Sequence, residues 1–221
     1  HGNYGVSSNC GSSNVLEYLG VKFSNDETHL KKCLDQSNIC YLHAPIFHPS
    51  MKNVAPIRKD LGFKTFFNLL GPLVNPSSPK NQITGVYNLE IARLYGYIFK
   101  NTNKNFSIVY SLDGYDEISL TGSFKLINNF SEIISDCNYF KLQKTMAKDI
   151  LGGKSIEDSA NIFKNILSGK GTNNQVNVVL ANSSLAIQTI TNKDIDECIE
   201  IAKESIESGK AYSSLKKLIE A

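Results

Sequence analysis

The sequence has little that would direct it to a membrane, to nucleic acid or to an oxidising compartment. No apolar run approaches the roughly 20 residues that span a bilayer, and no signal-peptide pattern is present. The formal net charge is only +2, so electrostatics give no case for nucleic acid or a membrane surface as a partner. The five cysteines are odd in number and lack CxxC spacing, which favours free thiols over a zinc site. We therefore expect a cytoplasmic protein without nucleic-acid or membrane partners.

Arginine is also scarce, because the 23 basic residues include only Arg58 and Arg93. Arg93 falls within an ordinary helix pattern. A chain that uses lysine almost everywhere is expected to keep arginine where planar, bidentate geometry matters, as it does for a carboxylate. A surface salt bridge is the alternative interpretation of Arg58.

What is present is the composition of a globular domain. The 221 residues are 41% hydrophobic, with no repeats, no low-complexity tract and no long linker. A chain of this length buries one sizeable core, so a single domain over residues 1–221 is expected.

Strand and helix patterns alternate through the middle of the chain and predict an α/β fold with a mostly parallel central sheet flanked by helices. Strands are expected at 39–42, 81–87 and 106–111, and helices at 24–35 (capped by Ser24), 48–61 and 89–99. Short β segments at 124–127, 132–134 and 140–142 predict an antiparallel excursion at the sheet edge. Four helices are expected at the end of the chain, at 155–167, 175–190, 193–207 and 211–220.

The first twenty residues are crowded with glycine, serine and asparagine before a short apolar helix pattern begins. Glycine lets backbone approach a ligand closely, and serine adds hydrogen-bond donors. A helix start capped by Ser12 or Ser13 would add free N–H groups and the positive end of a dipole. A phosphate or diphosphate requires these features, although a flexible entry loop has the same composition.

Three carboxylates, Asp113, Asp116 and Glu117, follow directly on the predicted strand at 106–111. Ligands gather beyond the carboxyl ends of strands in open α/β sheets, so this loop lies where a site is expected. Adjacent carboxylates repel each other unless a cation or solvent separates them. A hard divalent ion such as Mg²⁺, shared with a diphosphate, is the usual reason to place them together. A solvated acidic turn is the alternative.

Four ordered segments resemble the anthranilate phosphoribosyltransferases. They are the opening stretch from His1 to Gly20, Phe47–Lys59, Phe67–Pro76 and Gly114–Ser119, and residues 151–221 also follow the family's pattern around Leu180-Ala181-Asn182. The resemblance implies a fold of the nucleoside phosphorylase and phosphoribosyltransferase type. It also implies transfer of the phosphoribosyl group of phosphoribosyl diphosphate (PRPP) to the amine of anthranilate, in tryptophan biosynthesis.

The same resemblance assigns site residues in three groups. The PRPP contacts correspond to His1, Gly2, Asn3, Tyr4, Gly5, Val6, Ser7, Ser8 and Ser12. The anthranilate contacts correspond to Asn3 and Arg58 with His48 as a pocket wall, and the Mg²⁺ ligands to Asp116 and Glu117. Tyr4 departs from the pattern, because many members carry Arg there. Asp113 is interpreted as a turn residue, and His29 and His43 receive no role. No side chain is expected to act as a catalytic acid or base, because metal, backbone N–H groups and orientation supply most of the acceleration.

The chain begins inside a motif and without an initiator Met. Compared with the family it lacks an N-terminal helical domain, a Gly-Thr-Gly-Gly-Asp loop and the Lys that precedes the His. We therefore expect a fragment that is inactive by itself, with residues 49–73 forming an apolar segment that packs on the missing domain. The resemblance implies a homodimer for the full-length protein.

Two other functions are compatible with parts of this pattern. A pyrimidine nucleoside phosphorylase shares the architecture and a serine-bearing phosphate loop, but needs neither the Arg58 carboxylate contact nor the Asp116–Glu117 pair. A non-catalytic paralogue that binds nucleic acid or a partner protein should show basic clusters with interleaved aromatics, whereas the lysines here are spread along predicted surface helices.

Overall fold

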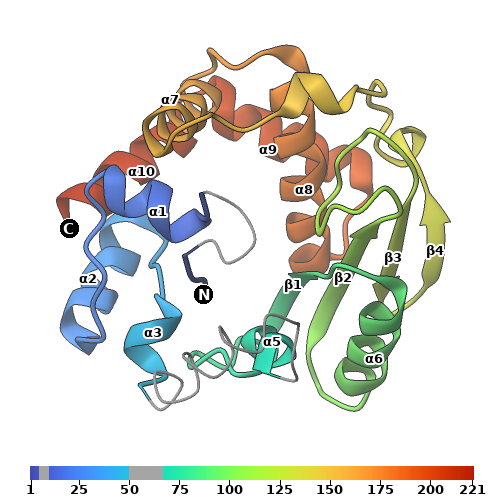
Figure 1. Ribbon diagram of the computed structural model, residues 1–221, viewed down its shortest axis with the longest axis horizontal. Helices are drawn as coiled ribbons and strands as arrows, with labels where there is room; N and C mark the ends of the chain where they lie inside the picture. The colour runs from blue at the N-terminus through green and yellow to red at the C-terminus, as the bar shows by residue number, and fades with distance from the viewer. Residues whose placement is uncertain (5–9, 50–66) are drawn as a thin grey trace. The chain divides into compact units, whose positions relative to one another are not determined.

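The computed structural model describes residues 1–4, 10–49 and 67–221 (Figure 1). The chain divides into two compact units. The first unit contains residues 1–78, 152–168 and 209–221, and the second contains residues 79–151 and 169–208. Each unit is therefore assembled from segments that are distant in the sequence.

The second unit is built on a sheet whose described strands follow the order β1-β2-β3-β4. Their bounds are β1 Asn81–Gly85, β2 Asn105–Ser111, β3 Phe124–Asn128 and β4 Glu132–Ser135. Helix α6 (Leu89–Lys100) connects β1 to β2, which are parallel, and β3 and β4 then add by antiparallel pairing. This arrangement confirms the α/β class and the antiparallel excursion.

The expectation of a mostly parallel sheet needs correction for the described strands. Only the β1–β2 pairing is parallel there, because no crossover helix lies between β2 and β3 or between β3 and β4. The expected β segment at 140–142 is also wrong. A 3₁₀ turn at Cys137–Phe140 ends there, with Lys141 in the left-handed region at a φ of 51°.

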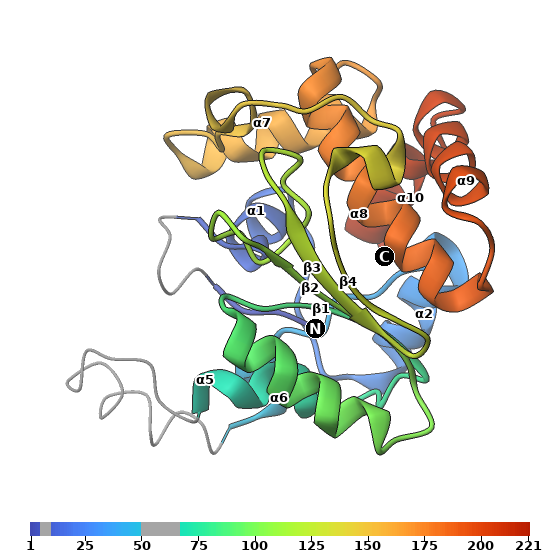
Figure 2. The same ribbon diagram turned by 90° about the vertical axis from the view of Figure 1, so that its right-hand side faces the viewer.

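Two helices cover the two faces of this sheet (Figure 2). Val109 of β2 pairs with Leu126 of β3, and both pack in the core with Ala181 and Leu185 of α8 (Asn173–Thr191). On the other face α6 approaches closely at Gly96, where a Cβ atom would lie 3.3 Å from the Ile127 side chain. The carboxyl ends of β1 and β2 are therefore backed by α8.

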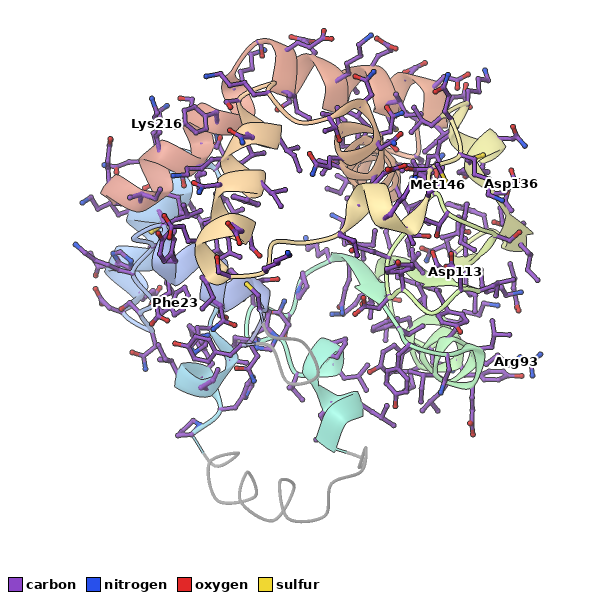
Figure 3. The ribbon with its side chains drawn as sticks, turned by 45° about the horizontal axis from the view of Figure 1, so that its top comes forward. Phe23, Arg93, Asp113, Asp136, Met146 and Lys216 are labelled. Carbon is purple, nitrogen blue, oxygen red and sulfur yellow. The ribbon has the colours of Figure 1, made fainter. Side chains whose placement is uncertain are left out.

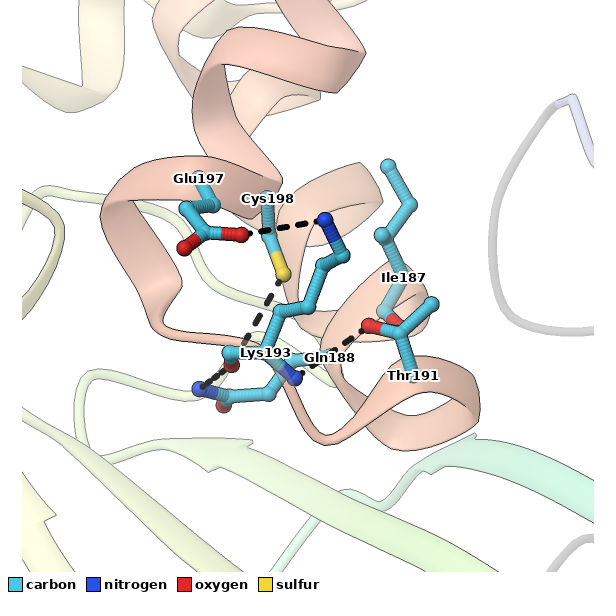
Figure 4. Close-up of polar contacts among 6 residues, drawn as sticks. All are labelled: Ile187, Gln188, Thr191, Lys193, Glu197 and Cys198. Carbon is cyan, nitrogen blue, oxygen red and sulfur yellow. Dashed lines mark hydrogen bonds and ion pairs between the residues drawn. The ribbon is translucent and has the colours of Figure 1, made fainter.

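The turn from α8 to α9 (Ile195–Glu207) is closed by polar contacts around Lys193 (Figure 4). The Lys193 carbonyl accepts from Gln188 Nε2 at 3.2 Å and from the Cys198 thiol at 3.9 Å. The Lys193 ammonium pairs with Glu197 at 3.0 Å. Asn192 supplies the left-handed residue, with a φ of 55°, that ends α8. The two expected helices are confirmed to within two residues at each end.

The first unit is helical in its described residues. Its helices are α1 Ser12–Tyr18, α2 Glu27–Ser37, α3 Ala44–Phe47, α5 Phe67–Leu70, α7 Ile156–Leu167 and α10 Lys210–Glu220, with a 3₁₀ turn at Gly71–Leu73. Helix α10 packs on α2, and α7 packs on α1. Val21, Cys33 and Leu218 are the buried centre of the α2–α10 contact. Helix α7 starts at a capping box formed by Ser155 and Asp158, as its sequence predicts.

Three local expectations in the first unit need comment. Helix α2 is capped by Asp26 rather than Ser24, because the Asp26 carboxylate accepts from the backbone N–H groups of Thr28 and His29. Residues 39–42 form no strand; the nearby pairing is an isolated bridge between Gly2 and His43. The helix expected at 48–61 falls almost wholly outside the described residues, and His48 itself ends α3 as its C-cap.

All five cysteines are free thiols, as expected. Among the described residues, no helix is long and apolar enough to cross a membrane.

Candidate functional site

The Asp116–Glu117 pair lies on the loop that follows β2, at the carboxyl end of that strand. Both residues are exposed. Asp113, on the same loop (Figure 3), is engaged differently: its carboxylate accepts a hydrogen bond from the Thr121 hydroxyl. Asp113 therefore closes the turn, whereas the described residues leave the carboxylates of Asp116 and Glu117 without a hydrogen-bond donor.

Contacts from three elements fix the backbone of this loop. Gly85, the last residue of β1, lies so close to the Asp116 carbonyl that a Cβ atom there would clash with it. The hydroxyl of Ser111, at the end of β2, donates to the Glu117 carbonyl at 2.6 Å. Asn182 of α8 forms two hydrogen bonds with the backbone of Ile118, at 2.9 and 2.8 Å. The carboxylates are thus presented from a rigid loop.

The loop borders a cavity of about 340 Å³ on the α8 side of the sheet. The cavity is lined by Ile83, Gly85, Val109, Asp116, Glu117, Asn182, Ser183 and Ala186. Its position beyond the ends of β1 and β2 is where α/β folds bind ligands. Sequence reasoning placed the two carboxylates here but gave no role to Asn182 and Ser183; only the family pattern around Leu180-Ala181-Asn182 hinted at them.

The electrostatics of the pair suit a cation. Crowding of the Glu117 carboxyl by neighbouring protein atoms, and then the negative charge of Asp116, raise the pKa of Glu117. A divalent cation would relieve both effects. The described residues contain no group of three or more His, Cys, Asp or Glu side chains able to hold a metal. A pair of carboxylates is by itself a donor set that suits Mg²⁺, because this ion takes one or two protein carboxylates and completes its shell with water and phosphate oxygens.

The described part of the opening segment, residues 1–4, lies in the first unit, and hydrogen bonds of its backbone hold it in place. The Gly2 N–H donates to the Leu42 carbonyl at 3.0 Å, and the Gly2 carbonyl accepts from Ala44 at 2.8 Å. A side chain at position 2 would clash with the Tyr41 hydroxyl. The Asn3 carbonyl accepts from the Ser13 N–H at 3.4 Å, which ties the segment to α1.

Beneath this segment is a buried polar cluster around His43. The Ser13 hydroxyl lies 2.9 Å from His43 Nδ1 and 2.9 Å from the Tyr41 hydroxyl. Phe23, labelled in Figure 3, stacks on the His43 ring with centroids 4.6 Å apart, and Tyr4 meets that ring edge-on at 4.7 Å. Burial lowers the pKa of His43. Sequence reasoning gave His43 no role, because it shows no metal-ligand spacing with any other residue.

The expected cap of α1 is wrong. The helix begins at Ser12 with Gly11 as its N-cap, and the Asn14 side chain accepts from the Gly11 N–H at 2.9 Å. The Ser13 hydroxyl is used by Tyr41 and His43 instead, and Ser12 is exposed in the first turn. The Tyr4 hydroxyl, where many relatives carry Arg, donates to Glu17 at 3.0 Å.

The structure brings some of the predicted binding residues together within the first unit. The rings of His1 and His48 meet edge-on with centroids 5.4 Å apart, so a predicted PRPP residue contacts a predicted anthranilate residue. His48 Nε2 is buried and has no hydrogen-bond partner among the described residues. The predicted residues Gly5, Val6, Ser7, Ser8 and Arg58 lie outside the described residues. Asp116 and Glu117 belong to the second unit.

Comparisons with known proteins identify the family of this chain. Residues 1–212 match the model of the glycosyl transferase family, a/b domain. An anthranilate phosphoribosyltransferase of Christiangramia forsetii is 59% identical over 218 residues, which cover 99% of this chain and 66% of that protein.

Two solved structures of the Saccharomyces cerevisiae anthranilate phosphoribosyltransferase are similar to this chain. The complex with PRPP and Mg is 31% identical with a TM-score of 0.91, and the match covers 100% of this chain and 63% of that one. The complex with 4-fluoroanthranilate is 28% identical with a TM-score of 0.86, covering 95% and 62%. The chain spans slightly less than two thirds of the length of these two proteins. The chain belongs to the glycosyl transferase family and, within it, to the anthranilate phosphoribosyltransferases.

Proposed function

We propose that this protein transfers the phosphoribosyl group of PRPP to the amine of anthranilate, giving N-(5′-phosphoribosyl)anthranilate and diphosphate in tryptophan biosynthesis. The observation that carries the proposal is the rigidly held Asp116–Glu117 pair, which lines a cavity beyond the ends of β1 and β2. A similar yeast enzyme is solved with PRPP and Mg, the ligands that such a pair would serve.

The metal part of the proposal assigns Mg²⁺ to the carboxylates of Asp116 and Glu117. When bound, the ion would neutralise charge on the diphosphate and so make it a better leaving group. The protein's own contribution is to hold the backbone that carries both carboxylates at the edge of the cavity, through Gly85, Ser111 and Asn182. Preorganised charges of this kind cost no rearrangement during the reaction.

The substrate part of the proposal assigns PRPP to the opening segment and anthranilate to Asn3, His48 and Arg58. Backbone contacts at Gly2 and Asn3 hold these two residues against α1 and residues 42–44. A carboxamide such as Asn3 both donates and accepts, which suits an amine beside a carboxylate. A similar yeast enzyme binds 4-fluoroanthranilate. The proposed chemistry is positioning of the amine against the ribose carbon, without a catalytic acid or base.

The carboxylate assignment is tested by the double variant Asp116→Asn with Glu117→Gln. We expect it to lose most of the Mg²⁺ dependence of PRPP binding, measured by calorimetric titration with and without Mg²⁺. The control is Asp113→Asn on the same loop, whose carboxylate serves Thr121 and should leave that dependence unchanged. Anthranilate is fluorescent, so its consumption with PRPP and Mg²⁺ measures turnover of the same variants when expressed from the whole coding sequence. A double variant with normal metal dependence would contradict the assignment.

The anthranilate assignment is tested by Arg58→Ala. Loss of a bidentate, charge-assisted contact to the carboxylate should weaken anthranilate binding by about 2–4 kcal/mol and spare PRPP binding. The matched control is Arg93→Ala, which removes the only other arginine of the chain from the exposed face of α6. Equal anthranilate affinity in the two variants would show that Arg58 does not bind the carboxylate.

The homodimeric assembly, the cytoplasmic location and the docking role of residues 49–73 stay predictions. Size measurement in solution and a truncation series test the first and the third.

A further inference from the structure

Asn182 makes an unusual set of contacts for a polar residue in the middle of a helix. Its Oδ1 accepts from the Ile118 N–H at 2.9 Å, and its Nδ2 donates to the Ile118 carbonyl at 2.8 Å. The same Nδ2 donates to the Val178 carbonyl, one turn earlier in α8, at 2.9 Å. The two bonds to Ile118 hold the peptide groups on both of its sides, and the first of these groups is shared with Glu117.

Packing of α8 on the sheet does not explain this amide. The neighbouring residues Ala181 and Leu185 are fully buried in the core and already seat the helix on β2. A partly buried carboxamide destabilises the fold unless its hydrogen bonds are made. Asn182 makes two of its hydrogen bonds with Ile118, on the loop that carries Asp116 and Glu117 and is called the acidic loop below. Asn182 also lines the same cavity as Asp116 and Glu117.

We propose that Asn182 is a positioning residue for the metal-binding carboxylates, an inference that rests on the proposed function. By locking Ile118 it fixes the direction in which the backbone delivers Glu117 and Asp116 to the cavity. Ser111 and Gly85 restrict the same loop from the two strands, so Asn182 supplies the restraint from the helix side. Outer groups that orient metal ligands typically change metal affinity by about 10- to 100-fold when they are removed.

The test is a titration of the chain with Mn²⁺ alone, followed by the paramagnetic resonance of the free ion. The variant is Asn182→Leu, which keeps the number and branching of the side-chain heavy atoms and removes both bonds to Ile118. The matched control is Thr189→Val. It removes a different polar contact of α8, the 2.7 Å hydrogen bond from Thr189 to Ser107, which lies near the start of β2 and away from the acidic loop. Asp116→Asn serves as the reference for loss of a ligand. Thermal unfolding of every variant shows whether it is folded.

We expect Asn182→Leu to bind Mn²⁺ about 10-fold more weakly, and Thr189→Val to bind it normally although it also lowers the melting temperature. Equal weakening in these two variants would reduce Asn182 to a general packing residue and overturn the proposal. If Asp116→Asn loses Mn²⁺ binding and Asn182→Leu keeps it, the positioning role is wrong and the proposed function stands. If neither variant changes binding, the pair is not the ion site and both proposals fail. Should Asn182→Leu not fold, Asn182→Ala adds no bulk to the cavity and is judged by the same outcomes.

Discussion

The acidic loop of the second unit and the opening segment of the first unit are both proposed to bind ligands, but different contacts hold them. The acidic loop is restrained through side chains of Ser111 and Asn182, and Asp116 and Glu117 are themselves exposed residues. The opening segment is restrained through backbone bonds at Gly2 and Asn3, above a buried cluster centred on His43. Under the proposed function the two regions have different tasks, because a metal site needs directed side chains whereas a phosphate cradle needs backbone groups near the ligand.

Each region has one glycine at which a side chain would clash, Gly85 at the acidic loop and Gly2 in the opening segment. Replacing these glycines should give the largest difference in unfolding free energy between the two regions. At Gly85 a new methyl group would meet the backbone carbonyl of Asp116, which has no alternative rotamer. We expect Gly85→Ala to destabilise the protein by about 3 kcal/mol and to weaken Mn²⁺ binding, because the acidic loop must move away. Denaturant unfolding and the metal titration measure the two effects.

The control for Gly85 is Gly96→Ala. Its methyl group would meet the end of the Ile127 side chain at 3.3 Å, and alanine favours the helix. This variant should keep Mn²⁺ binding. If Gly85→Ala were as stable as Gly96→Ala, the close approach of β1 to the acidic loop would be contradicted.

Gly2 provides the corresponding test in the first unit, with a smaller expected effect. Here the new methyl group would meet the Tyr41 hydroxyl, at the far end of a side chain rather than in the backbone. We expect Gly2→Ala to cost about 1–2 kcal/mol in unfolding free energy. The same substitution in a Tyr41→Phe background should cost less, because the clashing oxygen is gone.

A double-mutant cycle over Gly2 and Tyr41 measures this coupling. No rescue of this kind is available at Gly85, where the clash is with backbone. Additive effects of Gly2→Ala and Tyr41→Phe would show that the hydroxyl is not what restricts position 2.

The sequence predicts those features of the two regions that are local. The acidic pair follows a continuous apolar strand, and ligands lie at strand ends in α/β folds, so Asp116 and Glu117 could be placed beforehand. The helix α7 could be placed from Ser155 and Asp158, whose capping contacts span three residues. The parallel β1–α6–β2 unit also follows from short-range patterns.

Features that depend on distant partners could not be predicted in this way. Asn182 is 64 positions from Ile118, and no periodicity connects them. Ser13 resembles a helix cap by its place in the sequence, but His43 and Tyr41 use its hydroxyl. Ser24 resembles a cap for the same reason, and Asp26 competes successfully because its carboxylate reaches two N–H groups. At Ser13 local propensity was overruled by contacts that only the fold creates, whereas at Ser24 a neighbouring residue won a local competition.

The last prediction concerns the buried cluster under the opening segment and has the smallest expected effect. Burial lowers the pKa of His43 below its ordinary value of about 6.5, while the charge of Glu17 partly opposes this shift. As the pH falls through 6.5, the unfolded chain takes up this proton before the folded protein does, so stability declines until the folded pKa is also passed. Protonation would also place a charge between the rings of Phe23 and Tyr4.

We expect the free energy of unfolding to fall between pH 7 and pH 5, and to fall less steeply in His43→Gln. Urea unfolding of both proteins across this range measures the slopes. Equal slopes would show that His43 does not take up its proton on unfolding, and that the cluster tolerates the charged ring.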